Sequence, residues 1–427
     1  MGIAESKMNE ILHAFEIDYA RLNLIANDFC QDIKRGLDRE ASPFKMLKSY
    51  LGLPSGNETG CYLALDFGGT NVRVFAVELH GNGSYSVVKK VARPLVTKEY
   101  NYISRENTAE QLFDFIADLV TQITEDNKQY LLGHTFSFGS KQTNLNNARL
   151  ITWAKEFAVQ GVEGEVVNEL LQAAFVRKNR ANVIPVAVIN DTVATILTAA
   201  YEDTCTHIGS ICGTGHNTAY LEEYGGKQAA MILNLETGNF ARVPLNQYDV
   251  LVDAASEKVG QQLFEKMVAG RYLGTLFVVV LKEAGVIHRQ MEVTSKDLAD
   301  LIQDKSAEKQ VIRKFLQEQG FDGVVDSTLV LQMQKLAEAI VRRSARLIAA
   351  EYIGIVQHID HAFQRQHRIA IDGSLYEKMP NYAAIIQETL VELVGSEKAK
   401  QLSLGLENSG SGIGGAIAAA IYKENNC

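Results

Sequence analysis

The spacing of apolar residues near the start of the chain has a helical period. Between residues 5 and 50, Ile11, Phe15, Leu22 and Ile25 recur at spacings that suit a period of about 3.6 residues, with polar residues between them. Side chains with this spacing share one face of an α-helix. The segment 5–50 is therefore predicted to be helical.

Farther along, the pattern changes to the alternating or continuous apolar runs that are typical of β-strands. Runs at 62–66, 72–79 and 85–91 predict three strands, and a Gly-Asn-Gly turn at 81–83 joins the last two. Strands joined by tight glycine-rich turns pair in an antiparallel meander. This region is therefore predicted to begin an α/β domain.

The remaining pattern alternates between helices and strands, and it contains a second meander. The predicted elements are helices at 107–125 and 163–180, a buried strand at 183–189, a helix at 192–201, strands at 207–212, 218–222 and 231–236, a mostly helical stretch at 247–351, a last strand at 368–371 and a helix at 414–423. A β-meander that occurs twice in a mixed α/β chain predicts two similar lobes.

Each meander carries a glycine-rich turn between its first two strands, and both turns contain threonine and asparagine. The first turn reads Asp66-Phe-Gly-Gly-Thr-Asn71, and the second reads Cys212-Gly-Thr-Gly-His-Asn217. Glycine lets a backbone approach a ligand closely, and successive N–H groups in such a turn form a concave anion site. A single turn of this kind is usually a plain hairpin, but the repetition favours a pair of phosphate-binding turns.

Composition narrows the possible functions. The chain has 427 residues, which allows two or three domains, and its 46% hydrophobic and 22% charged residues are typical of a globular protein. A net charge of −9 argues against a nucleic-acid or anionic-membrane partner.

The five cysteines are widely spaced, which predicts free thiols and no zinc site. We expect a soluble cytoplasmic protein. The start MGIAES fits the loose pattern for N-myristoylation, but no basic cluster follows it.

Several nucleotide-binding classes are excluded by motif. The segment Gly410-Ser-Gly-Ile-Gly-Gly415 satisfies the dinucleotide pattern GxGxxG, but only twelve residues follow it, too few for the required helix, strand and acidic residue. The chain lacks the P-loop pattern GxxxxGK[ST] and the HRD and DFG motifs of protein kinases. These exclusions leave a phosphate-binding protein of another class as the interpretation.

Segments over nearly the whole chain resemble the hexokinase family, in the order that the family has them. They are LALDFGGTNVRVFAVEL (63–79) and GSICGTGHNTAYLEE (209–223), similar to the two phosphate segments; FSFGSKQTNLNNARLITWAKEF (136–157), NLETGNF (234–240) and GQQLFEK (260–266), similar to sugar-binding segments; VAVINDTVATIL (186–197), similar to the segment of the catalytic aspartate; and IDGSLYEKMP (371–380) and SGSGIGGAIAAA (409–420), similar to the adenosine and C-terminal glycine-rich motifs.

The resemblance implies an α/β fold of the actin-like ATPase superfold, in which two ribonuclease-H-like lobes, with added helices, flank a central cleft. The smaller lobe would hold 59–189, in a β-β-β-α-β-α-like order, and be completed by the C-terminal helix at 416–427. The larger lobe would hold 190–415, with the helical segment 1–58 packed on it. Closure of the lobes around a sugar is expected.

The resemblance also implies a reaction and its residues. The γ-phosphoryl group of Mg-ATP would pass to the 6-hydroxyl of a hexose, with Asp191 as general base and Lys155 as a cation near the sugar. On local pattern alone Asp191 is equally a helix N-cap. The other expected sugar-binding residues are Ser137, Asn190, Asn217, Glu236, Gln262 and Glu265. The expected nucleotide-binding residues are Asp66, Gly68, Gly69, Thr70, Asn71, Arg73, Gly213, Thr214, Gly215, Asp372, Gly373, Ser374, Gly410, Ser411 and Gly412. Mg²⁺ would arrive with ATP and have no assigned protein ligand.

Three positions depart from the family pattern. Gly139 stands where proline is usual, Ala154 where threonine is usual, and Ile413 where a basic residue is common. The alternatives that stay open are a kinase narrowed to one hexose and a catalytically weak sugar sensor. A chaperone-like ATPase of the same superfold would lack the sugar residues. The pattern leaves the preferred hexose, the regulation and the oligomeric state open.

Overall fold

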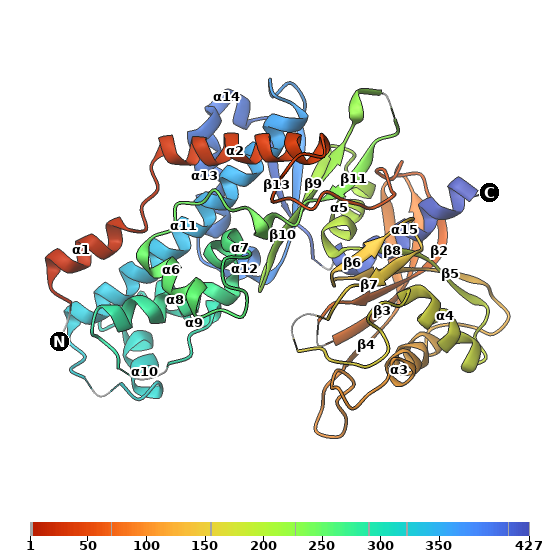
Figure 1. Cartoon of the computed structure of the whole chain (residues 1–427), viewed down its shortest axis with the longest axis horizontal. Coiled ribbons are helices and arrows are strands. Elements are labelled where there is room, and N and C mark those ends of the chain that lie inside the picture. The colour runs from red at the N-terminus through yellow and green to blue at the C-terminus, as the bar shows by residue number, and fades with distance from the viewer. Residues whose placement is uncertain are drawn as a thin grey trace. The chain divides into compact units, whose positions relative to one another are not determined.

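The computed structural model describes residues 3–69, 71–153, 156–226, 228–288, 291–321, 323–408 and 410–426 (Figure 1). The chain forms two compact units, each built from three separate stretches. The helical unit comprises Met1–Met46, Ile211–Asn217 and Glu236–Leu406, and the sheet unit comprises Leu47–Ser210, Thr218–Leu235 and Glu407–Cys427.

The sheet unit is built on a five-stranded sheet with the order β4-β3-β2-β5-β8. Strands β2 (Thr59–Phe67), β3 (Asn71–Gly81) and β4 (Ser84–Pro94) pair antiparallel, as the first meander predicts. Strands β5 (Tyr130–Phe136) and β8 (Val183–Ile189) run parallel to β2. With α3 (Ala109–Thr121) and α4 (Val167–Arg177) between the later strands, the predicted β-β-β-α-β-α order is present.

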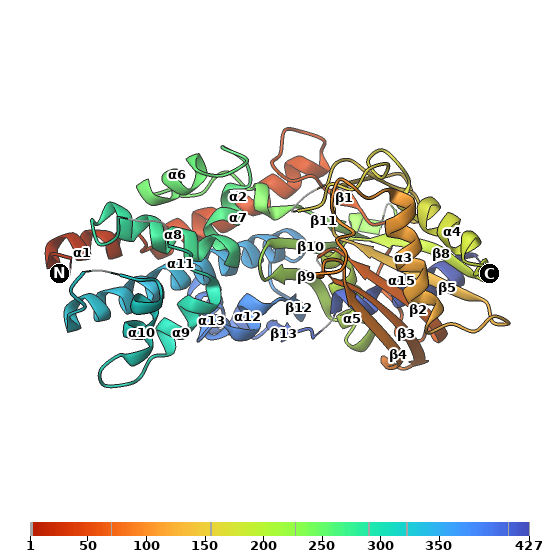
Figure 2. The ribbon, with the colours of Figure 1, turned by 90° about the horizontal axis from the view of Figure 1, so that it is seen from below.

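Helices cover both faces of this sheet (Figures 1 and 2). Side chains of a strand alternate between faces, and in β2 Leu63 and Leu65 enter the core that α3 and α4 share, whereas Tyr62 and Ala64 enter the opposite core. That opposite core is formed with α5 (Asp191–Glu202) and α15 (Gly410–Asn426). The C-terminal helix is thus part of the sheet unit.

Glycines allow α15 to lie directly on the sheet. A Cβ atom placed on Gly133 of β5 would lie 1.8 Å from the carbonyl oxygen of Gly415, and one on Gly414 would lie 2.3 Å from the carbonyl oxygen of Ala194 in α5. The GxGxxG pattern at 410–415 therefore occupies the first turns of a packed helix. This is consistent with the exclusion of a dinucleotide-binding fold.

The helical unit is organised around the 33-residue helix α11 (Ser327–Ile359), which packs against α2 (Tyr19–Leu37) and α13 (Tyr382–Val394). The other helices of this unit are α1 (Glu5–His13), α6 (Gln247–Ala254), α7 (Leu263–Val268), α8 (Gly270–Glu283), α9 (Ser295–Gln303), α10 (Gln310–Glu318), α12 (Ser374–Lys378), α14 (Ser396–Ala399) and the short 3₁₀ turn η2 (Thr237–Asn239). The helical pattern predicted for 247–351 is confirmed.

The second meander, β9 (Thr206–Cys212), β10 (His216–Glu222) and β11 (Met231–Asn234), belongs to a six-stranded sheet with the order β1-β11-β10-β9-β12-β13. The chain passes from one unit to the other within β9 and again within β10. Strand β12 (His367–Asp372) pairs parallel with β13 (Leu402–Leu406).

Two sequence-based expectations about elements are wrong. The strand predicted at 368–371 is not the last, because β13 follows it; β13 is short and only its first residue is buried, so it has little apolar pattern. The predicted helical segment 5–50 ends at Leu37, and β1 (Leu47–Lys48) lies beyond it. The short hairpin of β6 (Ser140–Gln142) and β7 (Ala148–Leu150) was also not predicted.

Candidate functional site

The second glycine-rich turn has a backbone suited to anions. The carbonyl oxygens of Gly213 and Thr214 accept hydrogen bonds from the N–H groups of Gly270 and Arg271 at the start of α8, at 2.9 and 3.1 Å. In a trans peptide the N–H points opposite to the C=O. The N–H groups of Thr214 and Gly215 therefore point away from α8 on the same side, which is the arrangement of an anion-binding nest.

The expected adenosine motif lies against this turn. Gly373 has φ of 138°, and a Cβ atom there would lie 2.3 Å from the carbonyl oxygen of Cys212 and 2.8 Å from the nitrogen of Gly213. Only glycine fits such a contact. The helical unit thus brings Asp372, Gly373 and Ser374 next to the second turn.

The two glutamates expected to bind sugar are neighbours in the helical unit. Asn217 Nδ2 donates to Glu236 Oε1 at 3.2 Å, and Asn217 Oδ1 accepts from the N–H of Thr237 at 3.3 Å. Glu265 Oε1 accepts from the backbone N–H of His216 at 3.3 Å. The turn η2, which directly follows Glu236, packs against α7, which contains Glu265, and the charge of Glu236 is one of the causes that raise the pKa of Glu265.

Backbone strain marks two of these positions. Glu236 has φ of 60° and Gln262, which precedes α7, has φ of 53°. The left-handed region is unfavourable for residues other than glycine, and strain of this kind often collects at binding sites. It supports a functional reason for the conformation of both residues.

Glu265 is held in a narrow backbone cradle. A Cβ atom on Gly215 would lie 2.9 Å from Glu265 Oε1, and one on Gly238 would lie 3.0 Å from its Cβ. Burial raises the pKa of Glu265, the N–H and the charge of His216 lower it, and the charge of Glu236 raises it again, with a net increase.

In the sheet unit the first glycine-rich turn meets the expected sugar loop. A Cβ atom on Gly68 would lie 2.5 Å from the Cβ and Oγ atoms of Ser137, so these residues touch because position 68 is glycine. Arg73 Nη2 lies 2.8 Å from Asp66 Oδ2 across β2 and β3. Thr70, also expected here, lies outside the described residues.

Asp191 is the first residue of α5 and is separated from the end of β8 at Ile189 by Asn190 alone. The helix is capped by Asn190, whose Oδ1 accepts from the N–H of Thr192 at 3.0 Å. Asp191 Oδ1 accepts from the same N–H at 2.9 Å, and its side chain is partly exposed. Asn190 is therefore the N-cap residue of α5, and Asp191, at the next position, is not the N-cap.

Lys155 and Ala154 lie outside the described residues, but the adjoining part of the loop is well packed. The ring of Trp153 stacks on Phe157 at 5.1 Å and meets Phe138 edge-on at 4.9 Å. Trp153 Nε1 donates to the carbonyl of Val159 at 2.9 Å. Phe67, next to Gly68, also belongs to this cluster, so the loop and the first turn share one aromatic core.

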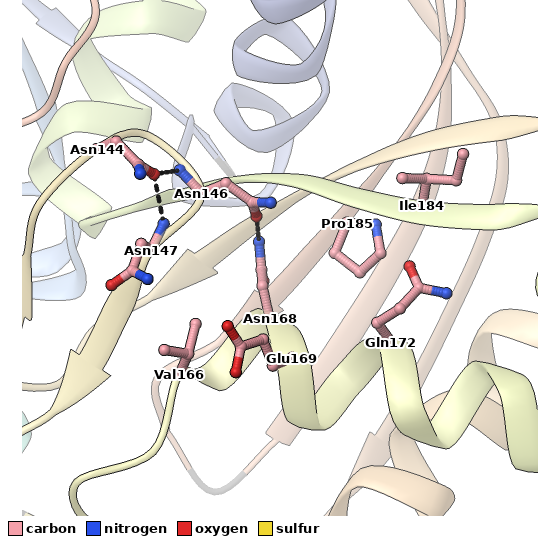
Figure 3. A pocket seen from close by; sticks show the side chains of 9 residues that line it. All are labelled: Asn144, Asn146, Asn147, Val166, Asn168, Glu169, Gln172, Ile184 and Pro185. Carbon is pink, nitrogen blue, oxygen red and sulfur yellow. Dashed lines mark hydrogen bonds between the residues drawn. The ribbon is translucent and has the colours of Figure 1, made fainter.

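A pocket of about 320 Å³ lies under the tip of the β6–β7 hairpin (Figure 3). Amide side chains dominate its lining, which consists of Asn144, Asn146, Asn147, Val166, Asn168, Glu169, Gln172, Ile184 and Pro185. Asn168 joins Asn146 at 2.5 Å and the ring of His134 at 3.2 Å. None of the expected site residues lines this pocket.

The C-terminal motif residues Gly410, Ser411 and Gly412 are buried at the start of α15. A Cβ atom on Gly412 would lie 2.8 Å from the ring of Phe75, and the carbonyl of Gly410 accepts from Thr198 Oγ1 at 2.8 Å. These contacts give Gly410 and Gly412 a packing role in the sheet unit. A role in nucleotide binding stays a prediction.

Three residues near the site were not predicted from the sequence. Lys45 Nζ lies 3.9 Å from Glu236 Oε2, and His216 pairs with Glu351 of α11. Lys45 is in a loop and Glu351 is inside a long apolar helix, so neither has a local motif. The only signal was the position of His216 within the second turn.

The described residues contain no group of three or more His, Cys, Asp or Glu side chains arranged to hold a metal ion. Cys30, Cys61, Cys205 and Cys212 are unpaired, as predicted. Among the helices of the described part, none has the length and apolarity needed to cross a membrane.

Comparison with known proteins gives consistent results. Two family models, both described as hexokinase, match residues 7–201 and 207–421. The chain is 33% identical to hexokinase-7 of Oryza sativa subsp. japonica over 95% of this chain and 94% of that protein. A crystal structure titled hexokinase matches with a TM-score of 0.87 and 32% identity, covering 98% of this chain and 99% of that one. A hexokinase from Schistosoma mansoni complexed with glucose matches with a TM-score of 0.82 and 32% identity, covering 97% and 98%.

Proposed function

Because the chain belongs to the hexokinase family, and is a hexose kinase that uses ATP, we propose that it transfers the γ-phosphoryl group of Mg-ATP to the 6-hydroxyl of a hexose such as glucose, with Asp191 as general base. The hydroxyl oxygen attacks the γ-phosphorus, Asp191 takes the hydroxyl proton, and the bond to the bridging oxygen breaks to release ADP. The relative crystallised with glucose supports this sugar as the substrate.

The observation that carries the role of Asp191 is its position at the junction of β8 and α5, beside a cap that another residue provides. A carboxylate in the first turn of a helix is favoured by the helix dipole, which stabilises the ionised form that a base needs. Asp191 is also partly exposed, so substrate can reach it.

The test of this role is Asp191→Asn, which keeps the size of the side chain and removes its basicity. We expect kcat to fall by about 10²- to 10⁴-fold, the usual cost of losing a general base, while glucose binding stays within about tenfold. Glu202→Gln, at the other, exposed end of α5, is the matched control. An Asp191→Asn enzyme that keeps more than half of the normal kcat contradicts the assignment.

For the sugar, we propose Ser137, Lys155, Asn190, Asn217, Glu236, Gln262 and Glu265 as ligands. The clustering of Asn217, Glu236 and Glu265 supports the proposal, since charged acceptors bind hydroxyl donors strongly. A cage of this kind discriminates between sugars because an inverted hydroxyl leaves a buried partner unpaired.

For the nucleotide, we propose that the two glycine-rich turns bind phosphates and that 372–374 bind the adenosine. The carbonyl groups of Gly213 and Thr214 support this, because they point toward the start of α8 and leave the N–H groups of the turn on the opposite side. Mg²⁺ enters as part of the Mg-ATP substrate and neutralises charge on the phosphates during transfer.

The predicted lobes, 59–189 with 416–427, and 190–415 with 1–58, remain part of this proposal. The packing of α15 against β2, β5 and β8 supports the completion of the smaller lobe by the C-terminal helix. Closure on sugar binding is tested with Trp153, the single tryptophan. We expect glucose to change its emission saturably and Mg-ATP alone to change it much less. An unchanged emission from an active sample contradicts closure that involves this loop.

Two further expectations belong to the proposal. A cytoplasmic location is retained, although one relative from Oryza sativa is named chloroplastic. Preference among hexoses is best measured as kcat/KM across glucose, mannose, fructose and N-acetylglucosamine.

A further inference from the structure

A buried ion pair lies directly behind the expected sugar site. His216 Nε2 and Glu351 Oε2 are 2.5 Å apart, and both side chains are fully inaccessible to solvent. His216 begins β10, immediately after the second glycine-rich turn, and Glu351 lies in α11. Burying two charges costs free energy. Neither residue has a catalytic role among those described above, so the presence of the pair needs a functional explanation.

The pair keeps a positive charge on His216. Burial by itself lowers the pKa of a histidine, but the charge and hydrogen bond of Glu351, together with the interactions of Cys212, raise the pKa of His216 to about 10. The imidazole is therefore protonated at physiological pH. The thiol of Cys212 and the hydroxyl of Tyr382 are the other titratable groups that face this pair.

The same residue contacts the sugar carboxylate through its backbone. The N–H of His216 donates to Glu265 Oε1 at 3.3 Å, and the ring of His216 meets Phe264, the neighbour of Glu265, edge-on at 5.7 Å. The glycines at 215 and 238 also lie close to the side chain of Glu265. A displacement of His216 would therefore also move the side chain of Glu265.

The electrostatic need for this charge follows from the neighbours of Glu265. Burial and the charge of Glu236 raise its pKa, and the groups that oppose them are the N–H and charge of His216 and, more weakly, Arg271. Two carboxylates that share a site tend to keep a proton between them. A protonated Glu265 is a poorer acceptor for a sugar hydroxyl.

We propose that His216, charged by its partner Glu351, is a positioning residue that keeps Glu265 ionised and correctly placed, so that the enzyme retains its sugar affinity as the medium becomes acidic. The inference rests on the proposed role of Glu265 as a sugar ligand. It assigns the buried pair a part in substrate binding that depends on pH.

The test compares the pH profiles of kcat/KM for glucose in the wild type and in the double variant His216→Gln, Glu351→Gln, which replaces the ion pair by neutral side chains that can still hydrogen-bond. We expect the acid limb of the variant to move to higher pH by about one unit, so that kcat/KM falls by up to about tenfold relative to the wild type at the acid end of the profile and changes little near pH 8. The change should lie in the KM for glucose, with kcat and the KM for ATP affected less. The single variant His216→Gln should show the same shift if it folds.

A purely structural pair would give a different result. A folded double variant, checked by circular dichroism, with an acid limb at the wild-type pH overturns the inference. Glu265→Gln separates this failure from that of the proposed function. If Glu265→Gln leaves the KM for glucose unchanged, Glu265 is not a sugar ligand and both ideas fail. If it raises KM and removes the acid limb while the double variant keeps the wild-type limb, only the role of His216 is wrong.

Discussion

A buried histidine of the sheet unit and a buried histidine of the helical unit, His134 and His216, carry opposite charge states in this hexokinase. His134 in β5 of the sheet unit has Asn168 as its partner, and burial lowers its pKa to about 4. His216 in the helical unit has Glu351 as its partner, which raises its pKa to about 10 despite burial. One ring is therefore neutral near pH 7 and the other is charged.

The difference lies in the partner and not in the depth of burial. A neutral amide can only accept or donate a hydrogen bond, so desolvation decides the state of His134. At His216 desolvation is the largest single effect on the pKa, but the charge and hydrogen bond of Glu351 together with the interactions of Cys212 outweigh it. The interior of the sheet unit is accordingly neutral at this position, whereas the helical unit has a charged pair next to Glu265, a proposed sugar ligand.

The largest effect is expected from Glu351→Gln, which leaves the imidazolium of His216 without its counter-ion. Removing one partner of a buried pair costs about 3–5 kcal/mol of unfolding free energy. Because the pKa of His216 is raised from 6.5 to about 10 on folding, the stabilisation is complete below pH 6.5 and is lost as the pH rises toward 10. The deficit of the variant should therefore be large at pH 6.5 and small at pH 9.5. Urea unfolding, monitored by hydrogen exchange in α11, measures this deficit in unfolding free energy. Glu338→Gln, which changes an exposed residue on the same helix, is the control.

The second effect concerns His134→Phe, which replaces a neutral buried ring by an apolar one. The pKa of His134 falls from 6.5 to about 4 on folding, so the wild-type sheet unit should lose about 3 kcal/mol as the pH falls through this window. The variant should lose about 1 kcal/mol at pH 7, from the hydrogen bond to Asn168, but show less acid destabilisation. Trp153 emission during urea unfolding reports this unit. Equal acid slopes in the variant and the wild type, with the exposed His80→Asn as control, would contradict the assignment.

A third effect tests whether the charges of the helical unit serve the sugar. Glu236→Gln removes a charged acceptor worth about 1.5–3 kcal/mol, so the KM for glucose should rise roughly 10- to 100-fold and the KM for ATP little. Lys45→Gln, which removes the exposed cation 3.9 Å from Glu236, should change KM only slightly. Steady-state kinetics with each substrate varied decides this. A rise in the KM for ATP alone would place Glu236 in the nucleotide site.

The smallest effect is expected from Arg73 of the sheet unit, whose side chain is 40% exposed beside the buried carboxylate of Asp66. Solvent reaches the guanidinium group, and solvent-exposed ion pairs contribute about 1 kcal/mol or less. Arg73→Gln should raise the KM for ATP less than about fivefold. The difference should shrink at about 0.5 M salt, because exposed charges are screened. A large effect that salt does not alter would mean that Arg73 is buried against the nucleotide.

Local pattern was enough for the elements that carry strong periodicity. The apolar run of β8 and the helix after it were predicted with their junction at Asp191, because a buried strand and a capped helix each have a local signature. The two meanders were likewise readable from their turns. Site residues were identified mainly through resemblance, since a glutamate on a turn has no local mark of its function.

What was missed depends on contacts between distant segments. Glu351 lies 135 residues from His216, and nothing in the helical pattern of α11 distinguishes a buried glutamate with a partner from an exposed one. Strand β13 pairs with β12 through its backbone, so its side chains need not be apolar. Gly133 has no distinguishing pattern in the sequence, and Gly415 was noted only as part of the GxGxxG pattern, so only their packing shows why no other residue fits.

The placement of α15 has a consequence for how the protein is made. Strands β2, β3, β5 and β8 precede residues 236–406 in the chain, whereas α15, which shares one of their two cores with α5, follows these residues. The emerging sheet unit must therefore keep part of an apolar face uncovered while residues 236–406 are translated. Partly folded chains with exposed apolar surface aggregate readily and are held by chaperones. Translation speed between residues 236 and 406 should accordingly affect the yield of soluble enzyme.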